Sequence, residues 1–159
     1  MDELLNLLKR NAIETPANLA KMLGLTEAQV RAKISEYEKT GLIRGYKAIV
    51  NEEQAGDECV QAAIEVRITP EREGGFDHIA QRVSRFPEVE SLYLMSGGYD
   101  LLVIVRGETL REVAYFVSEK LATISGVLST ATHFMLKAYK DHGVLMEPEQ
   151  EHERLQVTP

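Results

Sequence analysis

TPANLAKMLGLTEAQVRAKISEYEKTG, residues 15–41, decides the fold of the N-terminal part of this 159-residue chain. Thr15-Pro16 is a typical helix start, because threonine accepts from first-turn amides and proline is tolerated at the first helical position. Gly24 can end that helix in the left-handed conformation. Thr26 with Gln29 three residues later forms a capping-box pattern, which starts a second helix. The stretch therefore predicts two helices joined by a tight turn.

The segments on either side of this stretch complete a small domain. An apolar stripe at helical spacing, Leu4 to Leu8, precedes it and predicts a short first helix that residues 11–15 break. A three- or four-residue turn that contains glycine matches the spacing of a DNA-reading helix-turn-helix. Residues 42–50 are rich in β-forming and basic side chains, so we expect a small wing or linking strand there.

The second helix of the pair presents a polar face. With Val30 at the centre of the buried side, about 100° per residue places six small or polar residues on or near the opposite side. These residues are Ala28, Gln29, Arg31, Ala32, Ser35 and Glu36. Small side chains permit close approach to the major groove, and Gln29 and Arg31 carry groups that can read base edges. We therefore predict that this face binds duplex DNA.

Other residues of this domain complete the predicted DNA-binding set. Lys33 and Lys39 suit phosphates better than bases. We add Thr15, Thr26 and Arg44 to the set because they lie at the two helix starts and in the predicted wing. A helical protein-interaction bundle is the alternative, and the acidic residues near the reading face keep it open.

Two stretches resemble a known family of regulators. Residues 18–26, NLAKMLGLT, are followed by Val30, Lys33-Ile34 and Glu38, and then by GLIRGY over 41–46. Together they resemble the Lrp/AsnC, or feast/famine, regulators. The resemblance covers nearly the whole chain, and it implies a winged helix-turn-helix followed by a ligand-binding domain of βαββαβ order.

Periodicity in the second part of the chain predicts that same order independently. The expected elements are a strand over 59–69, a helix over 76–86, a hairpin of strands over 89–95 and 101–105, a helix over 110–126 and a strand over 127–139. This order is typical of a split ferredoxin-like motif, an antiparallel sheet with both helices on one face. The predicted class is α+β, with a winged helix-turn-helix and a C-terminal ferredoxin-like domain of the RAM type.

Ser96-Gly97-Gly98-Tyr99-Asp100 is the candidate effector site. Consecutive glycines leave backbone amides and carbonyls uncovered, and Asp100 offers a carboxylate, so a zwitterionic amino acid would fit. The alternative is a hairpin turn in which Asp100 makes a local hydrogen bond. The resemblance supports the first interpretation, because Gly-x-Tyr-Asp matches the loop where these regulators bind effectors between neighbouring dimers. Thr130 and Thr132 are weaker candidates on one strand face, or else ordinary β-prone surface threonines.

The charge distribution suggests two domains with different partners. The net charge is −7, but residues 1–50 hold eight basic and six acidic side chains, a net of +2, and the remainder carries −9. We expect a DNA-binding domain over 1–50, a linker over 51–58, an effector-binding and oligomerisation domain over 59–141 and an acidic tail over 142–159.

Composition disfavours several protein classes. The longest apolar run, Leu101 to Val105, is far shorter than a membrane span, and the N-terminus lacks a signal-peptide pattern, so we expect a cytoplasmic protein. Cys59 is the single cysteine, which rules out an intrachain disulfide and a thiolate zinc site. The histidines are scattered without ligand spacing at positions 78, 133, 142 and 152. We therefore expect no metal, no cofactor and no catalytic histidine.

The leading functional hypothesis is a sequence-specific DNA-binding transcriptional regulator that responds to a small metabolite, an amino acid or a related compound. Its expected partners are double-stranded DNA, the effector and further copies of itself, as a homodimer that assembles to a tetramer or octamer. An enzyme like the sirohaem decarboxylases, which share this layout, is one alternative; Ile43-Arg44-Gly45-Tyr46 departs from their Arg-Arg-Phe-Gly pattern. A DNA-independent metabolite-binding adaptor is another.

Overall fold

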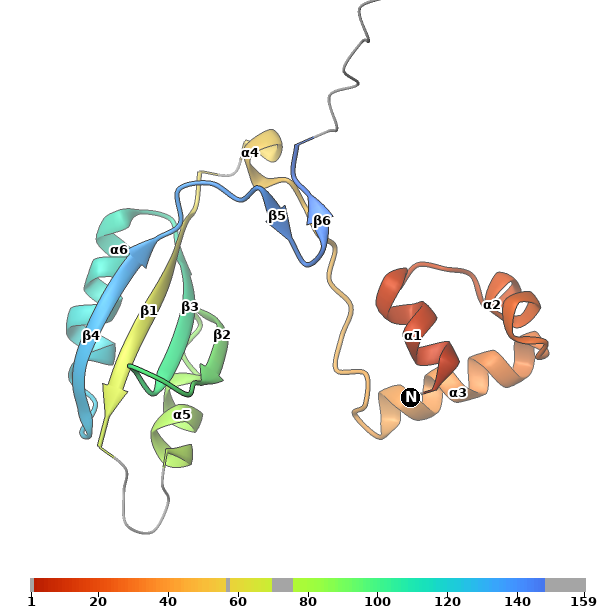
Figure 1. The fold of residues 1–159 in the computed structure, drawn as a ribbon, viewed down its shortest axis with the longest axis horizontal. Coiled ribbons are helices and arrows are strands. Elements are labelled where there is room, and N and C mark those ends of the chain that lie inside the picture. Colours follow the sequence, from red (N-terminus) through yellow and green to blue (C-terminus); the bar gives the residue numbers. More distant parts are fainter. Residues whose placement is uncertain (1, 57, 70–75, 148–159) are drawn as a thin grey trace, which may run out of the picture. The chain divides into compact units, whose positions relative to one another are not determined.

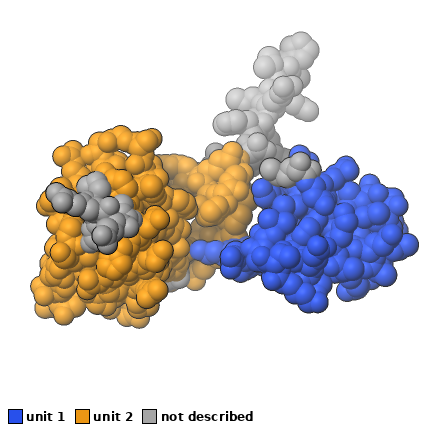
Figure 2. All heavy atoms as spheres, turned by 90° about the horizontal axis from the view of Figure 1, so that it is seen from below, with its two compact units in different colours: residues 1–48 blue, residues 49–159 orange. Residues whose placement is uncertain are grey.

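The computed structural model describes residues 2–56, 58–69 and 76–147. The chain separates into two compact units, Met1–Ala48 and Ile49–Pro159, which carry different colours in Figure 2. Each unit has its own hydrophobic core.

Unit 1 contains three helices (Figure 1). They are α1 Glu3–Arg10, α2 Pro16–Leu23 and α3 Glu27–Lys39. Thr15 caps α2 by accepting from the Asn18 amide at 3.2 Å, and Gly24 ends that helix with a φ of 64°. Thr26 starts α3 through a complete capping box. These elements confirm the three predicted helices.

The core of unit 1 lies between the three helices. Its buried residues are Leu4, Leu8, Leu19, Ala20, Val30 and Tyr37. Val30 and Tyr37 come from α3, and Val30 is fully buried, as the predicted orientation of this helix requires. The opposite side of α3 consequently faces outward.

The segment predicted as a small wing or linking strand, residues 42–50, forms no strand within the described chain. The Ile43 amide donates to the Tyr37 carbonyl at 3.0 Å and the Tyr46 hydroxyl donates to Glu38 at 3.1 Å, but residues 44–50 pair in no strand. β-forming side chains need a neighbouring strand to supply the ladder. The described part of unit 1 offers none, so this segment is an extended connection.

Unit 2 is built on a four-stranded antiparallel sheet of order β2-β3-β1-β4. The elements in chain order are β1 Val60–Ile68, α5 Asp77–Val83, β2 Val89–Leu94, β3 Leu101–Gly107, α6 Leu110–Tyr115 and β4 Val127–Phe134. α6 continues into a π-helical stretch, Phe116–Leu121, labelled η1, where the sequence predicted one regular helix. The predicted βαββαβ order and ferredoxin-like topology are confirmed.

α5 and α6 pack on the same face of the sheet (Figure 1). Alternate residues of the central strands point into this core and are almost fully buried. They are Ala62, Ile64, Val66 and Ile68 on β1 and Leu101, Val103 and Val105 on β3. Phe116 packs edge-on against Phe86, with ring centroids 5.5 Å apart. No helix of the described residues covers the other face of the sheet.

Short elements lie near both expected borders of the second domain. α4 Glu52–Ala55 lies within the predicted linker, and a hairpin of β5 Lys140–Asp141 and β6 Val144–Leu145 spans the predicted start of the tail. The Asn51 side-chain amide donates to the Met146 carbonyl at 2.5 Å, so the start of unit 2 contacts the residue that follows β6. The rest of the predicted tail, 148–159, lies outside the described residues. Among the helices of the described ranges, none has the length and apolar character to cross a membrane.

Candidate nucleic-acid and effector interfaces

The outward side of α3 carries most of the predicted DNA-binding residues. Ala28, Gln29, Arg31, Ala32 and Lys39 are exposed. Ser35 is half-buried, and Ile34 on the inner side packs against the core of unit 1. The helix therefore presents small side chains and one arginine on a surface that unit 1 leaves uncovered.

Gln29 and Thr26 are engaged in starting α3. The Gln29 side-chain oxygen accepts from the Thr26 amide at 2.9 Å and from the Thr26 hydroxyl at 3.0 Å. The Thr26 hydroxyl oxygen in turn accepts from the Gln29 amide at 3.2 Å. The NH2 group of Gln29 takes no part in this box, so this residue keeps a donor for a base but not its acceptor.

Arg31 forms an ion pair with Glu27, one turn earlier on α3. Arg31 Nε lies 2.9 Å and Arg31 Nη2 lies 2.5 Å from Glu27 Oε1. Glu27 is one of the acidic residues near the reading face that left the protein-interaction bundle open as an alternative, and its ion pair with Arg31 was not predicted from the sequence. The glutamate-to-arginine spacing of four residues was the signal that could have revealed it.

Lys33 belongs to a contact between helices α1 and α3. Its Nζ lies 3.3 Å from Asp2 Oδ2, while Asp2 Oδ1 caps α1 by accepting from the Leu4 amide at 3.0 Å. The neighbouring Tyr37 hydroxyl lowers the pKa of Asp2, with Lys33 adding to the shift. Burial, reinforced by Asp2, raises the pKa of Tyr37 to about 12. Lys33 thus has a structural partner on the side of α1.

The remaining DNA-binding candidates lie at the borders of the helices. Thr15 uses its side chain to cap α2. The Arg44 guanidinium lies over Gly41, where an added Cβ would come within 3.0 Å of it, and the φ of Gly41 is +73°. Gly41 therefore provides both the left-handed turn after α3 and the space for Arg44.

Asp100 anchors the predicted effector loop to the sheet. Its Oδ2 accepts from the Ile68 amide at 2.8 Å, and its own amide donates to the Val66 carbonyl at 3.0 Å. This bond reaches across to β1, 32 residues away in the chain, so it is not the local bond of a simple turn. One carboxylate oxygen is thereby committed to the fold, and Oδ1 is the oxygen that takes no part in the bond to Ile68.

The glycines of this loop are exposed. Ser96, Gly97 and Gly98 lie on the surface, and Tyr99 is half-buried. Gly97 has a φ of +136°, a conformation that L side chains rarely adopt. No atom lies within 4 Å of a Cβ built on either glycine, so their backbone groups are open to a small polar ligand.

Thr130 and Thr132 lie on β4, at the same end of the sheet as the loop. They pair with Val66 and Ile64, so their side chains share the helix-covered face and are half-buried. β1 separates β4 from β3, which places the threonines roughly 10 Å from the strand that carries Asp100. The seven predicted effector residues therefore share one region of the sheet but do not close a pocket within one chain.

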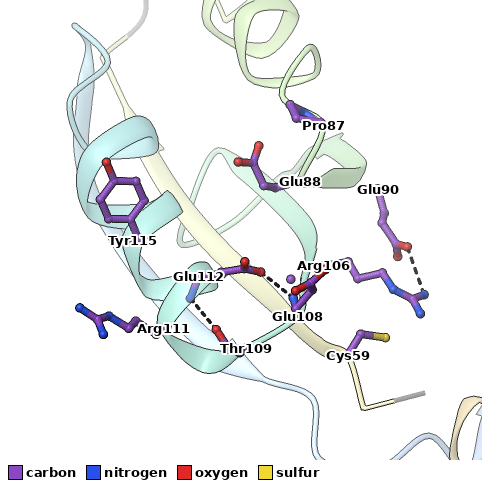
Figure 3. A pocket seen from close by; sticks show the side chains of 11 residues that line it. Cys59, Pro87, Glu88, Glu90, Arg106, Glu108, Thr109, Arg111, Glu112 and Tyr115 are labelled. Carbon is purple, nitrogen blue, oxygen red and sulfur yellow. Dashed lines mark hydrogen bonds and ion pairs between the residues drawn. The ribbon is translucent and has the colours of Figure 1, made fainter. Parts of the chain in front are cut away.

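A groove of about 810 Å³ lies at the opposite end of β3 and was not predicted (Figure 3). Arg106, on its wall, pairs with Glu52 at 2.6 Å and with Glu90 at 3.6 Å. Partial burial disfavours ionised Glu88, but its contact with Lys120 outweighs this and lowers the pKa of Glu88. Because Arg106 and Glu88 already have charged partners, we assign this groove no ligand.

The uncovered face of the sheet combines an apolar centre with charged borders. Ile104 on β3 pairs with Ala63 on one side and Ser91 on the other, and Leu102 pairs with Tyr93. Tyr93 on β2 points to this same face, and its side chain is 52% exposed. His133 lies 3.4 Å from Glu65 on the β4 side. An apolar surface of this kind is typical of an interface between protein chains.

Metal-binding side chains are dispersed in the described residues. No three of the histidine, cysteine, aspartate and glutamate side chains there are close enough together to hold a metal ion.

Family models match both units. A model described as Lrp/AsnC ligand binding domain matches residues 61–145, and one described as winged helix-turn-helix DNA-binding matches residues 3–44. The second match ends within the extended connection that replaces the expected wing strand.

Known proteins resemble the chain over nearly its full length. An uncharacterized HTH-type transcriptional regulator of Bacillus subtilis, YugG, is 44% identical over 99% of this chain and 95% of its own. The proline dehydrogenase transcriptional activator of Rhodobacter capsulatus is 32% identical over 80% of this chain and 82% of its own. The structure of a transcriptional regulator of Neisseria meningitidis, solved in complex with L-Met, is similar to this chain with a TM-score of 0.68 and 25% sequence identity. The match covers 89% of this chain and 93% of the Neisseria chain.

Proposed function

The chain belongs to the Lrp/AsnC family of transcriptional regulators, and from this we propose that it binds double-stranded DNA through α3 and responds to an amino acid. The observation that carries the proposal is α3 itself, a fully capped helix whose outward side is open. A helix placed in this way can enter the major groove, which is wide enough to admit it.

The charges of unit 1 suit DNA better than those of the whole chain. Residues 1–50 carry a net charge of +2, whereas the complete sequence carries −7. Lys39 is exposed at the end of α3 and suits phosphate contacts, and Ala28 and Ala32 let the helix approach the bases closely. Affinity for random duplex should be modest, because few phosphates are neutralised.

The amino-acid site that we propose is centred on Gly97, Gly98 and Asp100. Exposed backbone amides can donate to an α-carboxylate, and a carboxylate oxygen of Asp100 can accept from an α-ammonium. The complex of the related Neisseria regulator with L-Met supports this class of ligand. Because one chain leaves the site open, a neighbouring copy would complete it.

Oligomerisation follows from the uncovered sheet face. We propose that two copies pack their sheets face to face, which would bury Ile104, Leu102 and Tyr93 and form a homodimer. β2 and β4 are edge strands with unpaired backbone groups, and edges of this kind favour further assembly into tetramers or octamers. We propose that the protein acts in the cytoplasm. We propose no enzymatic role for it.

A salt titration of DNA binding tests the proposal. The full-length protein should bind the DNA upstream of its own gene more tightly than random duplex of equal length, with affinity that falls as salt rises. Arg31→Ala should reduce this binding, whereas the matched change Arg111→Ala, on exposed α6, should not. Equal affinity for the two duplexes at every salt concentration would favour the DNA-independent adaptor.

A thermal-shift screen of the twenty amino acids tests the effector. A ligand that binds only the folded state at 100 times its Kd stabilises by about 2.7 kcal/mol, which raises the melting temperature measurably. The absence of a shift with every amino acid at millimolar concentration would remove this part of the proposal.

A further inference from the structure

An ion pair lies on the exposed side of α3. Glu27 Oε1 accepts from both Arg31 Nε and Arg31 Nη2, at 2.9 and 2.5 Å. The side chains remain 47% and 64% exposed, so little packing holds them. Exposed pairs of this kind contribute little to stability. Stability therefore gives no reason for placing this pair on the face that would meet DNA.

The geometry of the pair leaves one edge of the guanidinium unoccupied by Glu27. A guanidinium has five N–H donors in one plane, and Glu27 takes those on the Nε side. The end of the group, with Nη1 and the outer hydrogen of Nη2, points away from that contact. Guanine offers N7 and O6 in the major groove, and two donors of an arginine match them.

We propose that Glu27 is a positioning residue that directs Arg31 to read a guanine in each half-site. This inference rests on the proposed DNA-binding function and deepens it. Holding the guanidinium before binding removes part of the rotamer freedom that binding would otherwise have to restrict. Glu27 also offsets the charge of Arg31, which weakens its attraction to any phosphate. The pair thus favours a directed base contact over sequence-independent binding.

The neighbours of the pair support a base contact. Ala28 and Ala32 lie on the same exposed side, and neither extends beyond a methyl group. They let the helix backbone come close enough for Arg31 to reach a base edge. Lys33, the next cation along α3, is turned toward Asp2, 3.3 Å away. Arg31 is therefore the cationic donor on the exposed side of this part of α3.

Selection of binding sites from a random duplex pool tests the inference with the full-length protein. Four proteins are compared: wild type, Glu27→Gln, Arg31→Lys and the matched control Glu36→Gln. Glu36 is exposed on the same helix and makes no ion pair among the described residues, so its change alters the charge equally without affecting Arg31. Melting curves by circular dichroism show whether each variant is folded.

The expected results distinguish a specific contact with guanine from a general effect of charge on DNA affinity. Wild type should select a motif with a guanine in each half-site. A bidentate contact discriminates by about fivefold to a hundredfold, so Arg31→Lys, which keeps the charge but not the planar fork, should reduce the preference for that guanine by about tenfold. Glu27→Gln should reduce it by about fivefold while raising affinity for random duplex. Glu36→Gln should raise the affinity for random duplex without reducing the preference for guanine.

Several results would overturn the inference. These are an undiminished guanine preference in Glu27→Gln, an equal loss in Glu27→Gln and Glu36→Gln, or a motif that Arg31→Lys leaves unchanged. If wild type selects no motif at all, the proposed DNA-binding function fails together with the inference. A wild-type motif that the variants share would remove the inference alone.

Discussion

Replacing Asp100 separates its role in the fold from its proposed role in effector binding. Its Oδ2 accepts from the Ile68 amide at 2.8 Å in a part-buried position. Asp100→Asn keeps an oxygen acceptor at that place but removes the negative charge. Asp100→Ala removes both and leaves the Ile68 amide without this partner.

The magnitudes follow from that one bond. A hydrogen bond to a charged group contributes about 1.5–3 kcal/mol and a neutral one about 0.5–1.5, so Asp100→Asn should destabilise unit 2 by about 1 kcal/mol. Leaving a buried donor unsatisfied costs about 1–3 kcal/mol, so Asp100→Ala should cost more. For a domain of roughly 100 residues, each kcal/mol lowers the melting temperature by about 4–8 °C.

For effector binding, unlike for stability, we expect Asp100→Asn already to have a large effect. Losing a charge-assisted contact with an α-ammonium weakens affinity by about tenfold to a hundredfold, so Asp100→Asn should bind the amino acid poorly while remaining folded. Calorimetry with the amino acid that shifts the wild-type melting temperature measures this, at one protein concentration. Wild-type affinity in Asp100→Asn, together with a destabilised Asp100→Ala, would refute the effector role and leave Asp100 as a structural residue.

Three further predictions concern the two cores and the sheet face. Gly126→Ala should destabilise unit 2 by about 2–5 kcal/mol, because φ is +92° and the new Cβ would lie 2.7 Å from Cδ1 of buried Ile79. Ile104→Glu should convert the dimer to monomers in analytical ultracentrifugation, because an unpaired charge would be buried in the proposed interface. Raising the pH from 10 toward 12 should destabilise unit 1, because the fold raises the pKa of Tyr37 to about 12 and the stabilisation is complete only below the unfolded value of 10.

Each of these has a matched control. Gly97→Ala carries the positive-φ strain without a clash, so it should destabilise less than Gly126→Ala, and an equal effect would contradict the packing argument. Ile104→Val should remain dimeric, and a dimeric Ile104→Glu would contradict the proposed interface. Tyr37→Phe should lose the part of the alkaline destabilisation that comes from tyrosine ionisation, and an unchanged pH dependence would contradict its assignment to Tyr37.

Local sequence patterns predicted most of the helices and strands. Thr15-Pro16, Gly24 and the Thr26 capping box act on backbone groups a few residues away, so their effect can be read without a tertiary structure. The alternation on β1 and the continuous apolar run on β3 likewise reflect burial that recurs at a fixed period. Residues 44–50 form no strand within the described chain, although their side chains favour one, because strand pairing depends on a partner segment elsewhere.

The candidate sites were predictable only in part. The exposed side of α3 follows from helical geometry, so Ala28, Arg31 and Ala32 face outward as expected. The partners of the polar groups do not follow from it. Lys33 contacts Asp2 from another helix, and Gln29 commits its oxygen to the capping box. Contacts with DNA and with an effector remain predictions for both sets of residues.

The sequence by itself determined the two-unit α+β architecture, the capped helix pair and the glycine loop, because these depend on periodicity and on interactions between near neighbours. Only the tertiary structure decided that Asp100 holds the Ile68 amide, that Thr130 and Thr132 lie across β1 from the loop, and that no described helix covers one face of the sheet. These features join residues far apart in the chain, and strand order, which sets them, is a property of the packed core rather than of any local segment.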